Sequence, residues 1–329
     1  MKDHSEPRHQ ELGGIFDTTG VVRGEDGIKR YEGLPRNLVQ MFRAAVDRDG
    51  AAEAVVETGG GPRLSYASLW DRAARVAGGL RGLGVRRGDR VAIRLGNGVD
   101  WVLAFFGAVL ADAIVVPVNT RFTEEEANYV VTDSGAAYVF TPGAALPDGD
   151  ALVVDDAEPS GAAAIFYTSG TTGFPKGAMH SHENVLANVE TVYRVSDIPR
   201  DAGREMRTLV VVPLFHVTGC HSQTLPALRI GGAAVIDAAF DGRRMIETLE
   251  RERITACTAV PAIYYYILNH PDFTPAKVAG VRGASYGGAP IAPDLVHQIG
   301  ERFAGARLAD APPRELQRPG QRRRRRRRP

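Results

Sequence analysis

The sequence is poor in cysteine and opens without an apolar segment. Only two cysteines, Cys220 and Cys257, occur among the 329 residues, and they lie in apolar surroundings without the spacing of metal ligands. A disulfide framework and a cysteine-based zinc site are therefore excluded, and a cytoplasmic protein with reduced thiols is expected. The polar opening from Met1 to Pro7 predicts no secretory signal.

Long uninterrupted apolar runs are also missing. The most apolar stretch, residues 101–118, is broken by Asp112 and contains Pro117 near its end. A carboxylate at membrane depth is costly, so no membrane span is expected. The pattern instead predicts a buried helix over residues 100–110 and a buried strand over residues 113–118.

Basic residues are in excess only at the end of the chain. The formal net charge is +1, but residues 310–329 hold nine arginines against Asp310 and Glu315, so the rest is acidic on balance and no specific nucleic-acid partner is expected. The run Arg322–Arg328 has three interpretations: a tail for nucleic acid or an acidic surface, a solvated terminus, or out-of-frame translation of a GC-rich gene.

Helix and strand patterns alternate along most of the chain. This predicts an α/β fold with parallel-rich sheets covered by helices. Residues 1–35 are polar and are expected to form an irregular arm. Thr123 and Glu126 have the spacing of a helix capping box. Helices are also expected over residues 68–81 and 240–252, and strands over 90–95, 137–141, 162–166, 208–212, 233–236 and 255–260.

The segment from Tyr167 to Gly177 is the clearest chemical motif. It follows an expected buried strand and combines hydroxyls, glycines and one lysine. Glycine lets the backbone N–H groups approach anionic oxygens, hydroxyls add donors and a lysine adds positive charge, which indicates phosphate binding rather than a plain surface turn. The candidate phosphate-binding residues are Thr168, Ser169, Gly170, Thr171, Thr172, Gly173 and Lys176.

A P-loop is excluded by the neighbours of the lysine. That motif needs glycine before the lysine and a serine or threonine after it, whereas here Pro175 precedes Lys176 and Gly177 follows it. The segment instead resembles the signature loop of the adenylate-forming (AMP-binding) superfamily, which includes acyl-CoA synthetases, luciferase-like enzymes and peptide-synthetase adenylation domains. Other segments resemble that family in the right order, namely Leu64–Leu69, Phe106–Asn119, Pro213–Gly219 and Tyr286–Pro290.

The resemblance runs from about Leu38 to about Ala311 and then stops. This abrupt loss of the family pattern just before the arginine run favours out-of-frame translation among the three interpretations of that run. The family continues with an aromatic-Gly-x-Thr-Glu element whose glutamate binds Mg²⁺, and later with a hinge and a C-terminal lid that carries a catalytic lysine; this chain departs from that pattern. The resemblance thus implies an incomplete N-terminal adenylation domain over residues 36–311, with an arginine-rich tail over 312–329 and impaired or absent turnover.

The resemblance also implies a reaction. ATP and a carboxylic acid would give an acyl-adenylate, which coenzyme A converts to a thioester. His216 would border the acid, with Lys176 as the second catalytic residue, although His216 alone would pass for a core-edge histidine. The residues expected at the adenine face are Gly287, Gly288, Ala289 and Pro290, which alone would be a simple turn.

Two alternatives stay open. One is a peptide-synthetase-like amino-acid adenylation domain, which is disfavoured because such domains usually hold an aspartate where this chain reads Pro213-Leu-Phe-His. The other is a nucleotide-binding remnant without turnover. His180 and His182 lack a carboxylate or thiol partner, so no metal ligand is assigned, and His182 is expected to form a local hydrogen bond.

Overall fold

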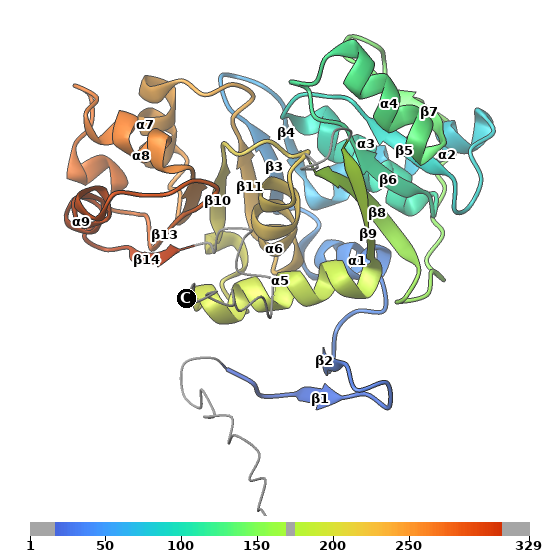
Figure 1. Ribbon diagram of the computed structural model, residues 1–329, viewed down its shortest axis with the longest axis horizontal. Coiled ribbons are helices and arrows are strands. Elements are labelled where there is room, and N and C mark those ends of the chain that lie inside the picture. The colour runs from blue at the N-terminus through green and yellow to red at the C-terminus, as the bar shows by residue number, and fades with distance from the viewer. Residues whose placement is uncertain (1–16, 169–174, 311–329) are drawn as a thin grey trace, which may run out of the picture.

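Two mainly parallel sheets form the framework. The computed structural model describes residues 17–168 and 175–310, and Figure 1 shows one sheet on each side of the molecule. The smaller sheet has the order β7 (Ala136–Phe140), β5 (Arg90–Ile93), β6 (Ile114–Pro117), β8 (Ala162–Thr168) and β9 (Lys176–Ser181). The larger has the order β14 (Arg307–Asp310), β13 (Gly283–Tyr286), β12 (Ala256–Ala259), β10 (Arg207–Val210), β11 (Ala233–Ile236), β3 (Glu53–Glu57) and β4 (Arg63–Ser65).

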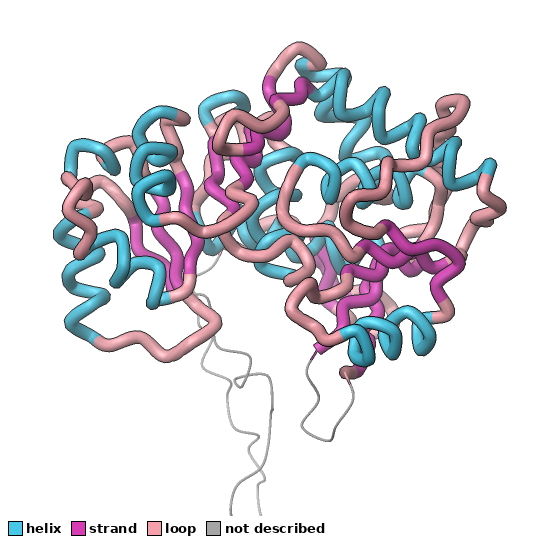
Figure 2. Tube along the Cα trace, turned by 90° about the horizontal axis from the view of Figure 1, so that it is seen from above, coloured by secondary structure: helices cyan, strands magenta, loops and turns pink. Residues whose placement is uncertain are grey.

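Within the described residues of these two sheets, only the edge strands β9 and β4 run antiparallel to their neighbours. Figure 2 shows the strands in separate groups with helices around them, which confirms the predicted α/β class. The α-helices are α1 (Leu38–Asp49), α2 (Tyr66–Gly82), α3 (Val99–Leu110), α4 (Glu124–Ser134), α5 (His182–Ser196), α6 (Leu225–Arg229), α7 (Gly242–Arg251), α8 (Pro261–Leu268) and α9 (Pro293–Arg302).

One apolar core joins the two sheets. It includes Val55 of β3 and Ile236 of β11 together with Val91 of β5 and Val115 of β6. Helix α3 supplies the middle of this core, because all of its residues except Asp100 are buried. The shared core fixes the edge of one sheet relative to the other, and that relation positions the segments discussed below.

Local sequence explains how several helices begin and end. In α4, Thr123 Oγ1 accepts a hydrogen bond from the Glu126 N–H, and the Glu126 carboxylate accepts one from the Thr123 N–H, so the predicted capping box is confirmed. The helix ends at Gly135, whose φ of 60° suits glycine. The apolar stretch at residues 101–118 is a helix followed by a strand, as expected, and no helix in the described ranges is long and apolar enough to cross a membrane.

The expected irregular arm over residues 1–35 is wrong in its described part. Residues 17–35 contain an antiparallel hairpin of β1 (Val21–Arg23) and β2 (Lys29–Tyr31). Its turn holds Asp26, which accepts from the Ile28 N–H, and Gly27 with a φ of 78°. This Asp-Gly pair is a hairpin pattern that the polar composition hides.

Candidate nucleotide and acid site

The β8–β9 hairpin places the two described ends of the phosphate motif opposite each other. Thr168 pairs with Lys176 in the register of the hairpin. The predicted residues Ser169, Gly170, Thr171, Thr172 and Gly173 lie outside the described residues. The hairpin therefore brings Thr168 and Lys176 together at the end where the connection between the two strands begins.

A glycine next to Lys176 allows close packing within this hairpin. Gly177 pairs with Tyr167, and a Cβ on Gly177 would lie 2.8 Å from Ile165 Cγ2 and 3.1 Å from Tyr167 Cζ. The Tyr167 hydroxyl donates to Asp133 Oδ2 at 2.6 Å. Burial and this carboxylate raise the pKa of Tyr167, so the hydroxyl stays protonated. The hairpin is thereby tied to α4.

Lys176 is exposed and uncommitted. Within residues 17–168 and 175–310, its ammonium makes no hydrogen bond or ion pair. The described arginines, in contrast, form most of the ion pairs of the fold, for example Arg94 with Glu124. A lysine ammonium offers three donors and a full positive charge. Lys176 can therefore meet an anionic ligand without first breaking an interaction of the protein.

His216 lies in a turn that follows β10. The turn is closed by a hydrogen bond from the His216 N–H to the Pro213 carbonyl at 3.0 Å. Asn97, just beyond β5 of the other sheet, holds the same turn: its Oδ1 accepts from the Leu214 N–H at 2.8 Å, and its Nδ2 donates to the Val212 carbonyl at 3.2 Å. Asn97 thus links the two sheets at the segment that carries His216.

A π-helix, Thr218–Thr224, follows this turn and connects it to the hairpin. Its His221 ring packs edge-on against Phe166 of β8, with centroids 4.7 Å apart, and lies 5.4 Å from the His180 ring of β9. Burial lowers the pKa of His221 to about 3, with His180 adding to the effect, so the imidazole is neutral at physiological pH. Gln223 Nε2 anchors the π-helix to the Leu209 carbonyl of β10 at 3.0 Å.

The predicted adenine-side residues lie at the end of β13. Gly288 has a φ of +79°, which favours glycine at this position, and residues 288–290 are exposed. β12 separates β13 from β10, so the two strand ends are roughly 10 Å apart at ordinary strand spacing. The carboxyl ends of parallel strands lie at the same edge of a sheet. Gly287–Pro290 and the His216 turn, which follow β13 and β10, therefore lie at the same edge of the larger sheet.

The two remaining histidines of the motif region pack or hydrogen-bond within the fold. His180 lies in β9 and stacks on Phe166 at 5.4 Å, and His182 begins α5 and accepts a hydrogen bond from the Leu38 N–H at 3.3 Å. The sequence predicted a local hydrogen bond for His182, and this is wrong, because its partner Leu38 lies 144 residues away along the chain. In the part of the chain that the structure describes, no three His, Cys, Asp or Glu side chains are grouped to hold a metal, so no residue is assigned to Mg²⁺.

Sequence reasoning missed two residues of this region, Asn97 and His221. Asn97 stands in a Gly-Asn-Gly segment that is typical of a turn, and its contacts are 115 and 117 residues away along the chain. His221 stands in the segment Thr218–Thr224, which is largely polar and has no recognisable motif. No local pattern carries either contact, so only the folded structure shows them.

Comparison with known proteins agrees with this arrangement. A family model described as AMP-binding enzyme matches residues 42–162 and 144–311. Feruloyl-CoA synthase of an Amycolatopsis species is 35% identical over 263 residues, which cover 74% of this chain and 53% of that protein. Long-chain-fatty-acid–CoA ligase FadD13 of Mycobacterium tuberculosis is 30% identical over 293 residues, 79% of this chain and 57% of the relative.

A solved structure shows the same architecture. The N-terminal domain of FACL13 from Mycobacterium tuberculosis superimposes with a TM-score of 0.74 at 26% identity, covering 84% of this chain and 75% of that one. The two sheets and the β8–β9 hairpin thus define the N-terminal domain of an adenylate-forming enzyme. The chain belongs to the family of AMP-binding enzymes, and it spans about half the length of the curated relatives it matches. The expected division at residue 311 and the arginine run fall outside the described residues.

Proposed function

We propose that this chain supplies the ATP- and acid-binding part of an AMP-forming acid:CoA ligase. The observation that carries the proposal is the β8–β9 hairpin, which holds an uncommitted Lys176 opposite Thr168 in a member of the AMP-binding family. The relatives named above are CoA ligases or synthases, which supports a carboxylic acid and coenzyme A as the other substrates.

The first half-reaction joins two anions. A carboxylate oxygen of the acid attacks the α-phosphorus of ATP, a new O–P bond forms, and the bond to the β-phosphate oxygen breaks so that pyrophosphate leaves. Positive charge and preorganised donors must lie where negative charge gathers. Lys176 supplies the charge on the side of the leaving polyphosphate, and the Thr168 hydroxyl supplies a donor beside it. Gly287–Pro290 present backbone to the adenine.

The second half-reaction transfers the acyl group. The thiolate of coenzyme A attacks the carbonyl carbon of the acyl-adenylate, and the C–O bond to AMP breaks to give a thioester. His216 borders the acid in this proposal, as a residue that lines the site rather than one that transfers a proton. The two cysteines are buried free thiols, which supports the expected reducing, cytoplasmic compartment.

Calorimetric titration of the full chain with ATP tests the role of the hairpin. Lys176→Ala should weaken binding by roughly tenfold or more, because it removes one charge-assisted interaction, while Lys176→Arg should retain most of the affinity. The matched control is Lys29→Ala, which removes another exposed lysine, on β2. Equal affinity of the wild type and Lys176→Ala, or an equal loss in Lys29→Ala, would overturn the proposal.

A further inference from the structure

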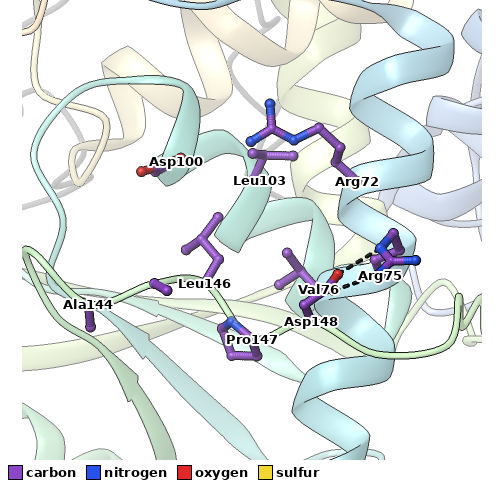
Figure 3. A pocket seen from close by; sticks show the side chains of 10 residues that line it. Arg72, Arg75, Val76, Asp100, Leu103, Ala144, Leu146, Pro147 and Asp148 are labelled. Atoms are coloured by element: carbon purple, nitrogen blue, oxygen red, sulfur yellow. Dashed lines mark hydrogen bonds and ion pairs between the residues drawn. The ribbon is translucent and has the colours of Figure 1, made fainter.

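A pocket of about 350 Å³ opens between α2, α3 and the connection that follows β7. None of the residues assigned above to ATP, the acid or the adenine lines it. Its volume lies in the range of small-molecule sites, roughly 300 to 1,000 Å³. Figure 3 shows the lining side chains, which come from the two helices and from residues 144–148 of the connection.

The connection is fixed to α2 by its backbone. The Gly149 N–H donates to the Arg75 carbonyl at 3.1 Å, and the Leu152 N–H donates to the Ala74 carbonyl at 2.9 Å. Gly78 makes this contact possible, because a Cβ there would lie 1.7 Å from the Asp150 carbonyl oxygen. The connection that forms the pocket wall is therefore held in place by backbone hydrogen bonds to α2.

The floor of the pocket is apolar. Val76 of α2 and Leu103 of α3 are buried beneath it, and Leu146 and Pro147 of the connection cover its side. Figure 3 shows Leu103 and Leu146 directed into the space between the helices and the connection. An apolar group of a ligand would leave water by lying on these side chains, which favours binding.

Two of the four charged side chains at the pocket form an ion pair with each other, and the other two do not. Arg75 pairs with Asp148, with Nε and Oδ1 2.7 Å apart. Within the described ranges, neither the Arg72 guanidinium nor the Asp100 carboxylate has a hydrogen-bond or ion-pair partner. Asp100 lies in the first turn of α3, where the helix dipole stabilises its negative charge. Arg72 and Asp100 are both exposed, so among the described residues the rim of the pocket presents an unpaired cation and an unpaired anion above an apolar floor.

This combination selects the charge pattern of a ligand. A carboxylate bound to Arg72 as a bidentate pair would leave Asp100 unpaired next to a like charge. An amine bound to Asp100 alone would leave Arg72 unpaired. A molecule that carries both charges and an apolar side chain offers a partner to each rim residue and to the floor.

We propose that this pocket binds a small zwitterion with an apolar side chain, the chemistry of a free apolar α-amino acid. Its carboxylate accepts hydrogen bonds from the Arg72 guanidinium, its ammonium donates to the Asp100 carboxylate, and its side chain lies on Leu103 and Leu146. The site is separate from the proposed ATP site, so the two proposals stand or fall independently.

Titration calorimetry of the full chain with L-leucine tests the proposal. The analogues 4-methylpentanoate, which lacks the amine, and 3-methylbutylamine, which lacks the carboxylate, keep the apolar group but only one charge each. Leucine should bind at millimolar concentration or below. Each analogue should bind roughly ten- to a hundredfold more weakly, because each loses one charge-assisted interaction.

Two variants and two matched controls locate the site. Arg72→Gln and Asp100→Asn should each weaken leucine binding roughly tenfold or more. Arg282→Gln removes an exposed arginine outside the pocket, and Asp294→Asn removes the corresponding first-turn carboxylate of α9. Both controls should bind leucine as the wild type does, and thermal unfolding checks that all four variants fold. Absence of leucine binding, equal binding of either analogue, or equal losses in the controls would overturn the proposal.

Discussion

The buried Glu190 carboxylate of α5 and the exposed Lys176 ammonium of β9 are handled in opposite ways by the fold. Glu190 accepts from Arg194 at 2.9 Å and from Arg229 at 3.1 Å, and it also pairs with Arg200. Lys176 has no partner in the part of the chain that the structure describes. The first charge holds α5, α6 and the segment after α5 together, whereas the second has no partner among the described residues and is proposed above to bind phosphate.

The difference separates stability from function. Removing one member of a buried ion-pair cluster leaves the other charges without compensation, which is strongly destabilising. Removing an exposed lysine without a partner changes no interaction of the described fold. A substitution of Glu190 should therefore lower mainly the stability of the fold, and a substitution of Lys176 should weaken mainly ligand binding. The predictions below test that contrast from the largest expected effect to the smallest.

Glu190→Ala should lower the free energy of unfolding by about 3 to 5 kcal/mol, because three arginines lose their common partner. Urea denaturation of both proteins measures the change. Glu183→Ala is the control on the same helix: its ion pair with Arg30 is more exposed, so its loss should cost less than about 1 kcal/mol. Similar losses of unfolding free energy at the two positions would mean that the Glu190 cluster stabilises the fold no more than an exposed ion pair does.

The same cluster should give an acid-dependent loss of stability. Burial raises the pKa of Glu190, but the hydrogen bonds from Arg200 and Arg194 more than offset it, so the pKa lies below its usual value. The resulting stabilisation is present above the unfolded pKa of about 4.3 and is lost as the pH falls through the folded pKa. Unfolding free energies measured at falling pH should decrease more steeply for the wild type than for Glu190→Gln. Identical slopes would argue against a depressed pKa.

Asn97→Ala should cost about 1 to 3 kcal/mol, because the Leu214 N–H and the Val212 carbonyl lose their partner at the contact between the sheets. Chemical denaturation measures this, and Asn128→Ala, at an exposed position of α4, should change little. The His216 turn lies next to the proposed acid site, so the binding of an acyl-adenylate analogue should also weaken. Unchanged stability in Asn97→Ala would show that the turn holds its shape without the amide.

Gly288→Ala should cost about 1 kcal/mol, because alanine tolerates a φ of +79° poorly. Gly283→Ala is the matched control in the preceding strand, since a Cβ at Gly283 meets no atom within 4 Å. Thermal unfolding compares the two variants. If the control loses as much stability, the cost does not come from the left-handed backbone at Gly288.

Local patterns in the sequence were enough to predict most of the framework. The helix expected over residues 240–252 is α7, Gly242–Arg251, and the strand expected over residues 208–212 is β10, Arg207–Val210. The spacing of apolar residues and the capping residues predict these helices and strands because both depend on only a few neighbouring positions. The β1–β2 hairpin was missed because its strands are short and charged, so alternation of apolar residues does not mark them.

The candidate site was predictable only where it coincides with a motif. The motif marked both Thr168 and Lys176, but their pairing was not predicted, because a strand was expected before the motif and none after it. Three other features depend on contacts between segments that are far apart in the sequence. They are the hydrogen bonds of Asn97, the packing of the neutral His221, and the position of the unpaired Arg72 and Asp100 at one pocket. Sequence alone also does not tell which arginines are paired in the fold and which charges stay free.

Hydrogen–deuterium exchange of the full chain, with and without ATP, tests the central claim most directly. Peptides covering residues 162–181 report on the β8–β9 hairpin, and peptides covering residues 185–196 report on the Glu190 cluster. We expect ATP to slow exchange in the hairpin peptides and leave the cluster peptides unchanged, and we expect Lys176→Ala to abolish the slowing. Unchanged hairpin exchange at high ATP concentration, or equal slowing in both regions, would contradict the assignment of the hairpin to nucleotide binding.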